Sequence, residues 1–138
     1  MRHTPLLRRS LVALAVAAVT GLGTTTAVAD PGIPNVGYGY PNPGRSVQCV
    51  QFFVNAYTNL HLLEDGKFGP QTELGVRKLQ ELSNRTWATR ELQIDGVFGQ
   101  DTGQVVLEHV KRDPWSTGDF TKATRCGHSV PSHSVVLN

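Results

Sequence analysis

An eight-residue pattern, Asp-Gly-x-Phe-Gly-x-x-Thr, occurs twice in this chain, thirty positions apart. The first copy is "DGKFGPQT" at 65–72 and the second is "DGVFGQDT" at 95–102. The Asp can accept hydrogen bonds from turn N–H groups, and the Gly after it permits a positive φ. The Phe is suited to anchor the loop, the second Gly to open a helix, and the Thr to bond a nearby backbone group. The pattern therefore predicts one loop-to-helix unit used twice.

Both copies are expected to be architectural rather than catalytic. If the two phenylalanines are fully buried, truncating either should cost about 3 to 5 kcal/mol of stability. The structural residues of the pattern are Gly66, Phe68, Gly69, Gly96, Phe98 and Gly99.

The stretch before the first copy has the apolar spacing of a helix. Val47, Val50 and Val54 recur at intervals of three and four residues, and Ser46 is a candidate N-cap. These residues predict a first helix over about 46–58.

Each copy of the pattern leads into a further predicted helix. Gly69 followed by proline suits a helix entry, which predicts a second helix over about 70–83. The third is expected over about 100–112, where Pro114 ends it. Residues 83–92 are polar and are expected to be irregular, with room for one short helical turn around Trp87. The predicted fold is an all-α, small three-helix bundle with two repeated loop-helix units. The apolar faces are expected to hold Thr72, Gly75, Val76 and Leu79 in the second helix and Thr102, Val105, Val106, His109 and Val110 in the third.

The segments that flank this bundle show no helical pattern. Residues 30–44 hold four Pro and four Gly, which predicts an extended linker or arm with little to bury. Tyr38 and Tyr40 could contact a ligand, but a loosely ordered spacer is the simpler interpretation. The tail, 113–138, is expected to be irregular, with Trp115 and Phe120 covering an open edge of the core.

The first 29 residues have the features of a secretory signal peptide. Arginines precede an apolar run, and "AVA" at 27–29 offers small residues for cleavage before Asp30. The run is shorter than the roughly 20 residues of a membrane span. We therefore expect a secreted mature chain of about 109 residues, with one domain at 45–112.

Removal of the signal changes the charge balance. It takes three of the 13 Lys and Arg and none of the 11 Asp and Glu, which leaves ten basic residues against eleven acidic ones. Nucleic-acid binders and proteins of anionic membrane surfaces need a clustered basic excess. We expect neither nucleic acid nor, after signal cleavage, a membrane as partner, and a monomeric protein.

Two cysteines, Cys49 and Cys126, remain after the signal. In an oxidising compartment an even pair is expected to form a disulfide, although free or metal-binding thiols are the alternatives. The loop that such a bond closes is long, so the chain-entropy model gives about 4 to 5 kcal/mol of stabilisation. No cofactor is expected.

Three stretches of this chain resemble a known family. "DGKFGPQTELGVRKLQ" at 65–80 is similar to the signature of peptidoglycan-binding domains of the Asp-Gly-x-Phe-Gly-x-x-Thr type. Residues 47–57 resemble the helix that opens such a domain, and 94–110 resemble its closing half. The similarity covers about 45–110. It implies a compact three-helix fold that holds bacterial cell-wall peptidoglycan, through its glycan or its stem peptide, without cleaving it.

The chain departs from that family at three points. Gly75 stands where the family commonly has Ala, and the segment with "NRTWATR" between the two copies is longer than usual. Such modules usually sit beside a wall hydrolase, which is not evident here. The resemblance therefore implies a free-standing binder, unless the tail adds a function of its own.

Other chemistries fit the residues less well. One Asp per copy supplies too few oxygens for a calcium loop. Asp65 and Asp95 could form a catalytic carboxylate pair, but the turn role already explains both. His128 and His133 could supply two zinc ligands, whereas a zinc hydrolase needs at least three, so no metal site is expected.

The sequence thus favours a secreted, non-catalytic peptidoglycan-binding protein with a shallow groove near the loops and helix ends. Two alternatives remain open: an inhibitor or interaction scaffold for another secreted protein, and a small cell-wall hydrolase. The candidate groove residues are Asp65, Lys67, Thr72, Trp87, Asp95 and Thr102.

Overall fold

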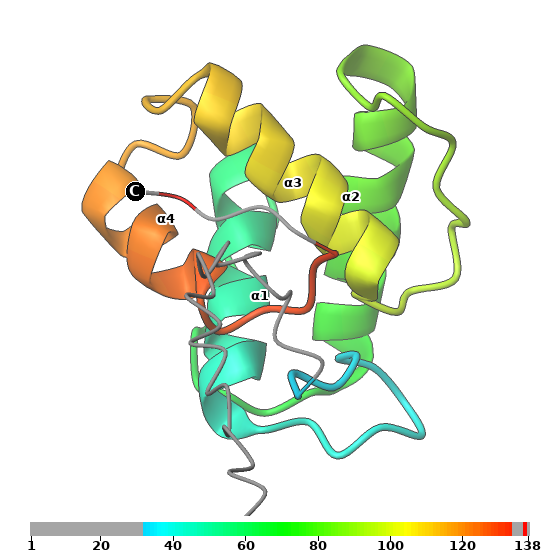
Figure 1. The fold of residues 1–138 in the computed structure, drawn as a ribbon. Coiled ribbons are helices and arrows are strands. Elements are labelled where there is room, and N and C mark those ends of the chain that lie inside the picture. The colour runs from blue at the N-terminus through cyan, green and yellow to red at the C-terminus, as the bar shows by residue number, and fades with distance from the viewer. Residues whose placement is uncertain (1–31, 134–136, 138) are drawn as a thin grey trace, which may run out of the picture.

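A computed structural model describes residues 32–133 and 137 of this chain, and over these residues it contains four α-helices and no β-strand. Figure 1 shows α1 in the centre, α2 and α3 crossing on one side of it and α4 on the other. This confirms the all-α class, but not the number of helices. None of the described helices is both long and apolar enough to cross a membrane. The helices are α1 (Gly44–Tyr57), α2 (Pro70–Thr86), α3 (Gln100–Arg112) and α4 (Phe120–Gly127).

The predicted signal peptide, 1–29, lies outside the described residues, as do 30–31, 134–136 and 138.

Two of the predicted helix starts are confirmed. Gly69 and Gly99 are the N-caps of α2 and α3, both with extended backbone, and Pro70 follows the first of them. The prediction for α1 needs a correction. The helix begins two residues before Ser46, and the Val47 N–H donates to the Pro43 carbonyl at 3.0 Å, so Ser46 is buried inside the helix rather than capping it.

The core gathers around α1, which contacts both α2 and α4. Phe98 is fully buried there and lies stacked with Phe53 of α1, with ring centroids 6.5 Å apart. Phe68 is only partly buried against this core, and Tyr38 packs edge-on against its ring. The predicted role of core anchor is thus confirmed for Phe98, but Phe68 is a half-buried residue at the rim.

The N-terminal arm is more ordered than its composition predicts. Val36 is fully buried and forms an antiparallel bridge with Phe98, with N–H to O distances of 3.1 and 2.8 Å. Asn42 closes the following turn, because its side chain accepts from the Gly37 N–H at 2.8 Å and donates to the Gly37 carbonyl at 2.9 Å. The prediction of a loosely ordered spacer is therefore wrong for residues 32–43.

The prediction of an irregular tail is also wrong, because α4 lies within it. Asp119 caps this helix by accepting from the Lys122 N–H at 2.8 Å. The predicted disulfide between Cys49 and Cys126 is confirmed and ties α4 to α1, with the two Cα atoms 5.1 Å apart. Trp115 does not cover the core, since 79% of it is exposed.

Candidate functional site

The two copies of the repeated pattern fold into the same turn. Gly66 and Gly96 have φ values of +72° and +76°, in the left-handed region that favours glycine. The side-chain oxygen Oδ1 of Asp65 accepts from the backbone N–H two residues later at 2.9 Å, and Asp95 does the same. The roles predicted for the Asp and for the first Gly are therefore confirmed in both copies.

A buried glutamine from the preceding helix holds the first turn. Gln51 of α1 places Nε2 2.9 Å from Asp65 Oδ1, 3.1 Å from the Lys67 carbonyl and 3.3 Å from Thr72 Oγ1. Its Oε1 accepts from the Gly66 N–H at 3.0 Å. One amide thus binds both ends of the eight-residue pattern.

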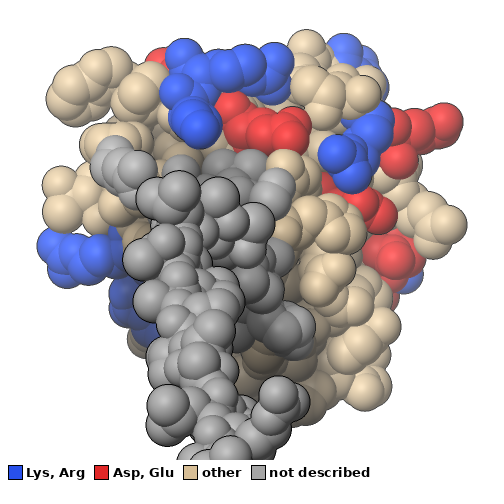
Figure 2. All heavy atoms as spheres, viewed as in Figure 1, with Lys and Arg blue, Asp and Glu red and all other residues tan. Residues whose placement is uncertain are grey.

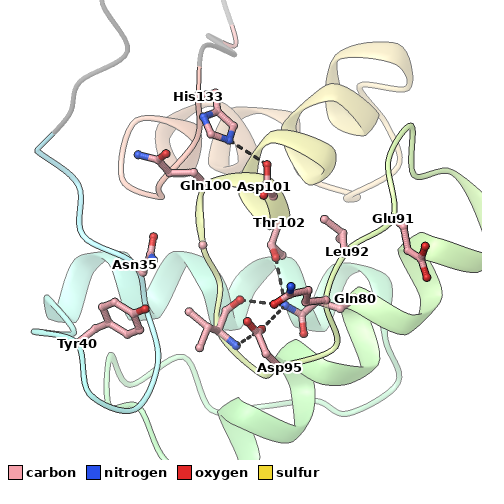
Figure 3. A pocket seen from close by; sticks show the side chains of 13 residues that line it. Asn35, Tyr40, Gln80, Glu91, Leu92, Asp95, Gln100, Asp101, Thr102 and His133 are labelled. Atoms are coloured by element: carbon pink, nitrogen blue, oxygen red, sulfur yellow. Dashed lines mark hydrogen bonds and ion pairs between the residues drawn. The ribbon is translucent and has the colours of Figure 1, made fainter.

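Gln80 of α2 does the same for the second turn (Figure 3). Its Nε2 lies 2.9 Å from both Asp95 Oδ1 and the Val97 carbonyl, and 3.1 Å from Thr102 Oγ1. Its Oε1 accepts from the Gly96 N–H at 3.1 Å. Neither glutamine was among the residues predicted for the site.

An asparagine one turn further along each helix binds the start of each loop. Asn55 donates to the Leu62 carbonyl at 2.8 Å and accepts from the Leu62 N–H at 2.5 Å. Asn84 and Leu92 form the same two bonds, each at 2.8 Å. The repeated unit therefore begins in the preceding helix with Gln-x-x-x-Asn, a signal that the sequence carries at 51–55 and again at 80–84.

A surface hollow lies at the start of α2 and another at the start of α3, with volumes of about 410 and 610 Å³. The Gln, Asp and Thr of each repeated unit line its own hollow. We call these the first and second hollows. The first is lined by Gln51, Leu60, His61, Leu62, Leu63, Asp65, Lys67, Phe68, Gly69, Pro70, Gln71 and Thr72. The second is lined by Asn35, Tyr40, Gln80, Glu91, Leu92, Gln93, Asp95, Val97, Gly99, Gln100, Asp101, Thr102 and His133.

The two hollows have the same frame but different linings. Leu60, Leu63 and Phe68 give the first hollow a larger apolar share than the second, and Lys67 also lines it. Amide and carboxylate side chains dominate the second, where Gln93 and Glu91 occupy the positions of Leu63 and His61.

Hydrogen bonds favour the ionised form of two of the lining carboxyl groups. The amide of Gln51, followed by the Lys67 N–H, lowers the pKa of Asp65. In the second hollow His133 lowers the pKa of Asp101 by a hydrogen bond, with Nε2 and Oδ1 2.9 Å apart, and Arg90 adds a bond of 3.1 Å. Figure 3 shows His133 reaching Asp101 from the C-terminal segment. Both carboxylates therefore act as acceptors at neutral pH.

The C-terminal segment can reach the second hollow because α3 has a glycine, Gly103, where the segment crosses it. A Cβ at Gly103 would overlap the carbonyl oxygen of Pro131. The segment therefore lies directly on α3 and delivers His133 to the second hollow.

The structure brings five of the six predicted groove residues to the hollows. Asp65 and Lys67 are exposed at the first hollow and Asp95 at the second, whereas the two threonines are buried behind them. Trp87 lines neither hollow. Its ring is stacked on His109, with centroids 4.3 Å apart. We infer that the threonines shape the hollows, and that Trp87 belongs to an aromatic cluster at the other ends of the helices.

This aromatic cluster also includes Tyr57, whose ring lies 5.4 Å from both Trp87 and His109. Its hydroxyl lies 2.8 Å from Ser116 Oγ, and burial raises its pKa to about 12. Burial likewise lowers the pKa of His109. Both side chains are neutral at pH 7.

Asp65 and Asp95 do not form the carboxylate pair considered from the sequence. Asp65 and Asp95 line different hollows, and each already bonds its own turn and its own glutamine. Within residues 32–133, no three His, Cys, Asp or Glu side chains lie close enough together to hold a metal ion.

Acidic and basic side chains lie next to one another across the upper part of the face in Figure 2.

Comparison of the chain with models of protein families, with curated proteins and with solved structures finds no match.

Proposed function

We propose that this protein is secreted and binds bacterial peptidoglycan without cleaving it. The observation that carries this proposal is the pair of hollows with the same frame, each built by one copy of the repeated unit. A wall polymer presents the same chemical unit again and again, so two similar sites on one small module can engage one chain and gain avidity. The pattern that builds the hollows is also the one that resembles wall-binding domains.

The chemistry of the second hollow suits a polar, uncharged polymer. Gln93, Gln100 and Asn35 offer amides at the second hollow, and the carboxylate of Asp95 is a further acceptor. Such groups can bond sugar hydroxyls, acetamido groups or peptide amides. Because a hollow at the surface leaves most of a bound polymer in solvent, we expect moderate affinity that increases with chain length.

Co-sedimentation of residues 30–138 with purified cell-wall sacculi tests this proposal. We expect the protein to pellet with sacculi, and Lys67→Ala combined with Gln93→Ala to pellet less. Lys78→Ala is the matched control, because Lys78 is exposed on α2 and lines neither hollow. The wild-type protein remaining in the supernatant at all sacculus concentrations would contradict the proposal.

Two other outcomes would point to the alternative functions. Capture of one defined secreted protein without sedimentation would favour an inhibitor or interaction scaffold. Clearing of a sacculus-containing gel would favour a hydrolase. A reduced sample, in which the bond between Cys49 and Cys126 is open, shows whether binding needs the intact fold.

A further inference from the structure

The N-terminal arm places one exposed aromatic ring beside each hollow. Tyr38 is 54% exposed and packs edge-on against Phe68, which lines the first hollow, with ring centroids 5.3 Å apart. Tyr40 is 41% exposed and lines the second hollow itself, where Figure 3 shows it next to Asn35. Tyr38 and Tyr40 are two positions apart in the chain, so one short segment of the arm reaches both hollows.

The turn that carries both rings is held in place. It is anchored on one side by Val36, which is fully buried and bridged to Phe98. Inside the turn, Asn42 bonds both backbone groups of Gly37, and the Tyr40 N–H donates to the Gly37 carbonyl at 3.2 Å. The rings are therefore presented to solvent from an ordered backbone, which lowers the entropy lost when a ligand binds them.

We propose that the turn at 37–42 joins the two hollows into one binding surface for the glycan strand of the wall, with Tyr38 and Tyr40 as stacking platforms for sugar rings. This inference rests on the proposed function and specifies its ligand as glycan rather than stem peptide. A sugar ring has an apolar C–H face and polar groups around its edge. An exposed aromatic ring beside a hollow lined with amides and carboxylates complements both parts.

The charge of the second hollow favours the same ligand. Glu91, Asp95 and Asp101 all line it, and the side chains of Arg90 and His133 are both bonded to Asp101. The carboxylates of a stem peptide would meet like charge there. Neutral N-acetylated sugars would not.

The test is a titration of the mature protein with a hexamer of β-1,4-linked N-acetylglucosamine and, separately, with a soluble stem pentapeptide. We expect binding of the hexamer to weaken about 3- to 10-fold in Tyr38→Ala and again in Tyr40→Ala, as loss of one aromatic contact predicts. Tyr38→Phe and Tyr40→Phe keep the ring and should bind within about twofold of wild type. Trp115→Ala, a substitution of an exposed aromatic residue outside both hollows, should not change binding.

The possible outcomes distinguish failure of this inference from failure of the proposed function. Wild-type protein that pellets with sacculi but binds the pentapeptide and not the hexamer would overturn the glycan assignment and leave wall binding intact. Alanine variants that fold, with an unchanged Tm, and bind the hexamer like wild type would overturn the role of the tyrosines. A wild-type protein that binds neither the probes nor sacculi would overturn both proposals.

Discussion

At the scale of single residues, two buried glutamines determine the shape of the candidate site. Gln51 and Gln80 are 2% and 1% exposed. Each joins its own helix to the Asp-Gly turn in the loop that follows that helix. Buried amides in such networks are sensitive to truncation, because each lost bond leaves a buried partner without one. The repeated turn is thus held by a residue outside the eight-residue pattern.

Replacing Gln80 by Leu should destabilise the protein although the volume is kept. The Gly96 N–H is buried and loses its acceptor, and the Val97 carbonyl and Thr102 hydroxyl lose their donor. We expect a loss of about 1 to 3 kcal/mol in the free energy of unfolding, measured by urea denaturation. Gln71→Leu, at an exposed position of α2, should change it by less than about 0.5 kcal/mol. Equal effects of the two substitutions would contradict the role given to Gln80.

Stability should fall on mild acidification because of His109. The pKa of this histidine is lowered in the folded protein, first by burial against Trp87 and Tyr57 and then by Arg112, while Asp113 raises it less. The unfolded chain therefore binds a proton more readily. The contribution of the neutral ring is complete above about pH 6.5 and is lost as the pH falls through the lowered value.

The corresponding measurement is the free energy of unfolding between pH 7.5 and 5. Wild-type protein should lose more stability over this range than His109→Gln, which does not titrate there. Parallel curves for the two proteins would show that His109 is not the group responsible.

At the scale of elements, the close packing of α1 and α2 depends on Gly75. A Cβ at this position would lie 2.6 Å from Val54 Cγ1 and 3.1 Å from Leu62 Cδ1. Valine has little rotamer freedom in a helix, so Val54 cannot move aside easily. The glycine at this position is therefore explained by the packing of this chain.

Gly75→Ala should destabilise the protein even though alanine is the better helix former by about 1 kcal/mol. Overpacking of a dense core typically costs about 1 to 3 kcal/mol, which outweighs that gain. The double variant Gly75→Ala/Val54→Ala should lose less unfolding free energy than the two single variants lose in total, because the second change removes the overlap. Additive effects in thermal denaturation would argue against this contact.

The starts of α2 and α3 could be predicted because their signals are local. Each helix start is set by the residues at that position: Gly69 and Pro70 for α2, and Gly99 for α3. The eight-residue α4 is too short to show periodicity, and it is held by the Asp119 cap and by the disulfide to Cys49. Val36 could not be recognised as core either, because its burial depends on Phe98, sixty-two residues later.

The difference between local signals and contacts distant in the chain also explains which site residues could be predicted from the sequence. Asp65 and Asp95 belong to the local pattern and lie at the hollows as expected. Trp87 lies elsewhere, because α2 continues to Thr86 and turns the indole toward His109. The glutamines were missed because their partners are 14 to 22 residues away along the chain.

At the scale of the whole molecule, one covalent bond fixes the outer helix to a small core. The Cys49–Cys126 disulfide closes a loop with a sequence separation of 77 residues. The double variant Cys49→Ser/Cys126→Ser should lose about 4 to 5 kcal/mol by the chain-entropy model, a large share of the stability of so small a domain. Urea denaturation of the variant and the wild type checks this value. A loss below about 1 kcal/mol would show that α4 docks without the bond.

The two repeated units build the first and second hollows, and the arm lies at both of them. α3 does not continue the repeat, since Val110 and Pro114 stand where a further Gln and Asn would be needed. The described part of the chain thus carries two such units, which is the number of sites that the wall-binding proposal requires.

The most direct test of this account is an NMR titration of ¹⁵N-labelled protein with solubilised cell-wall fragments. The account predicts that amide signals of 66–72 and 96–102 shift together with those of 37–42, while signals of α4 stay unchanged. Shifts confined to α4 or to the turn around Trp115, or no shifts at saturating fragment, would contradict the claim that the repeated units bind the wall.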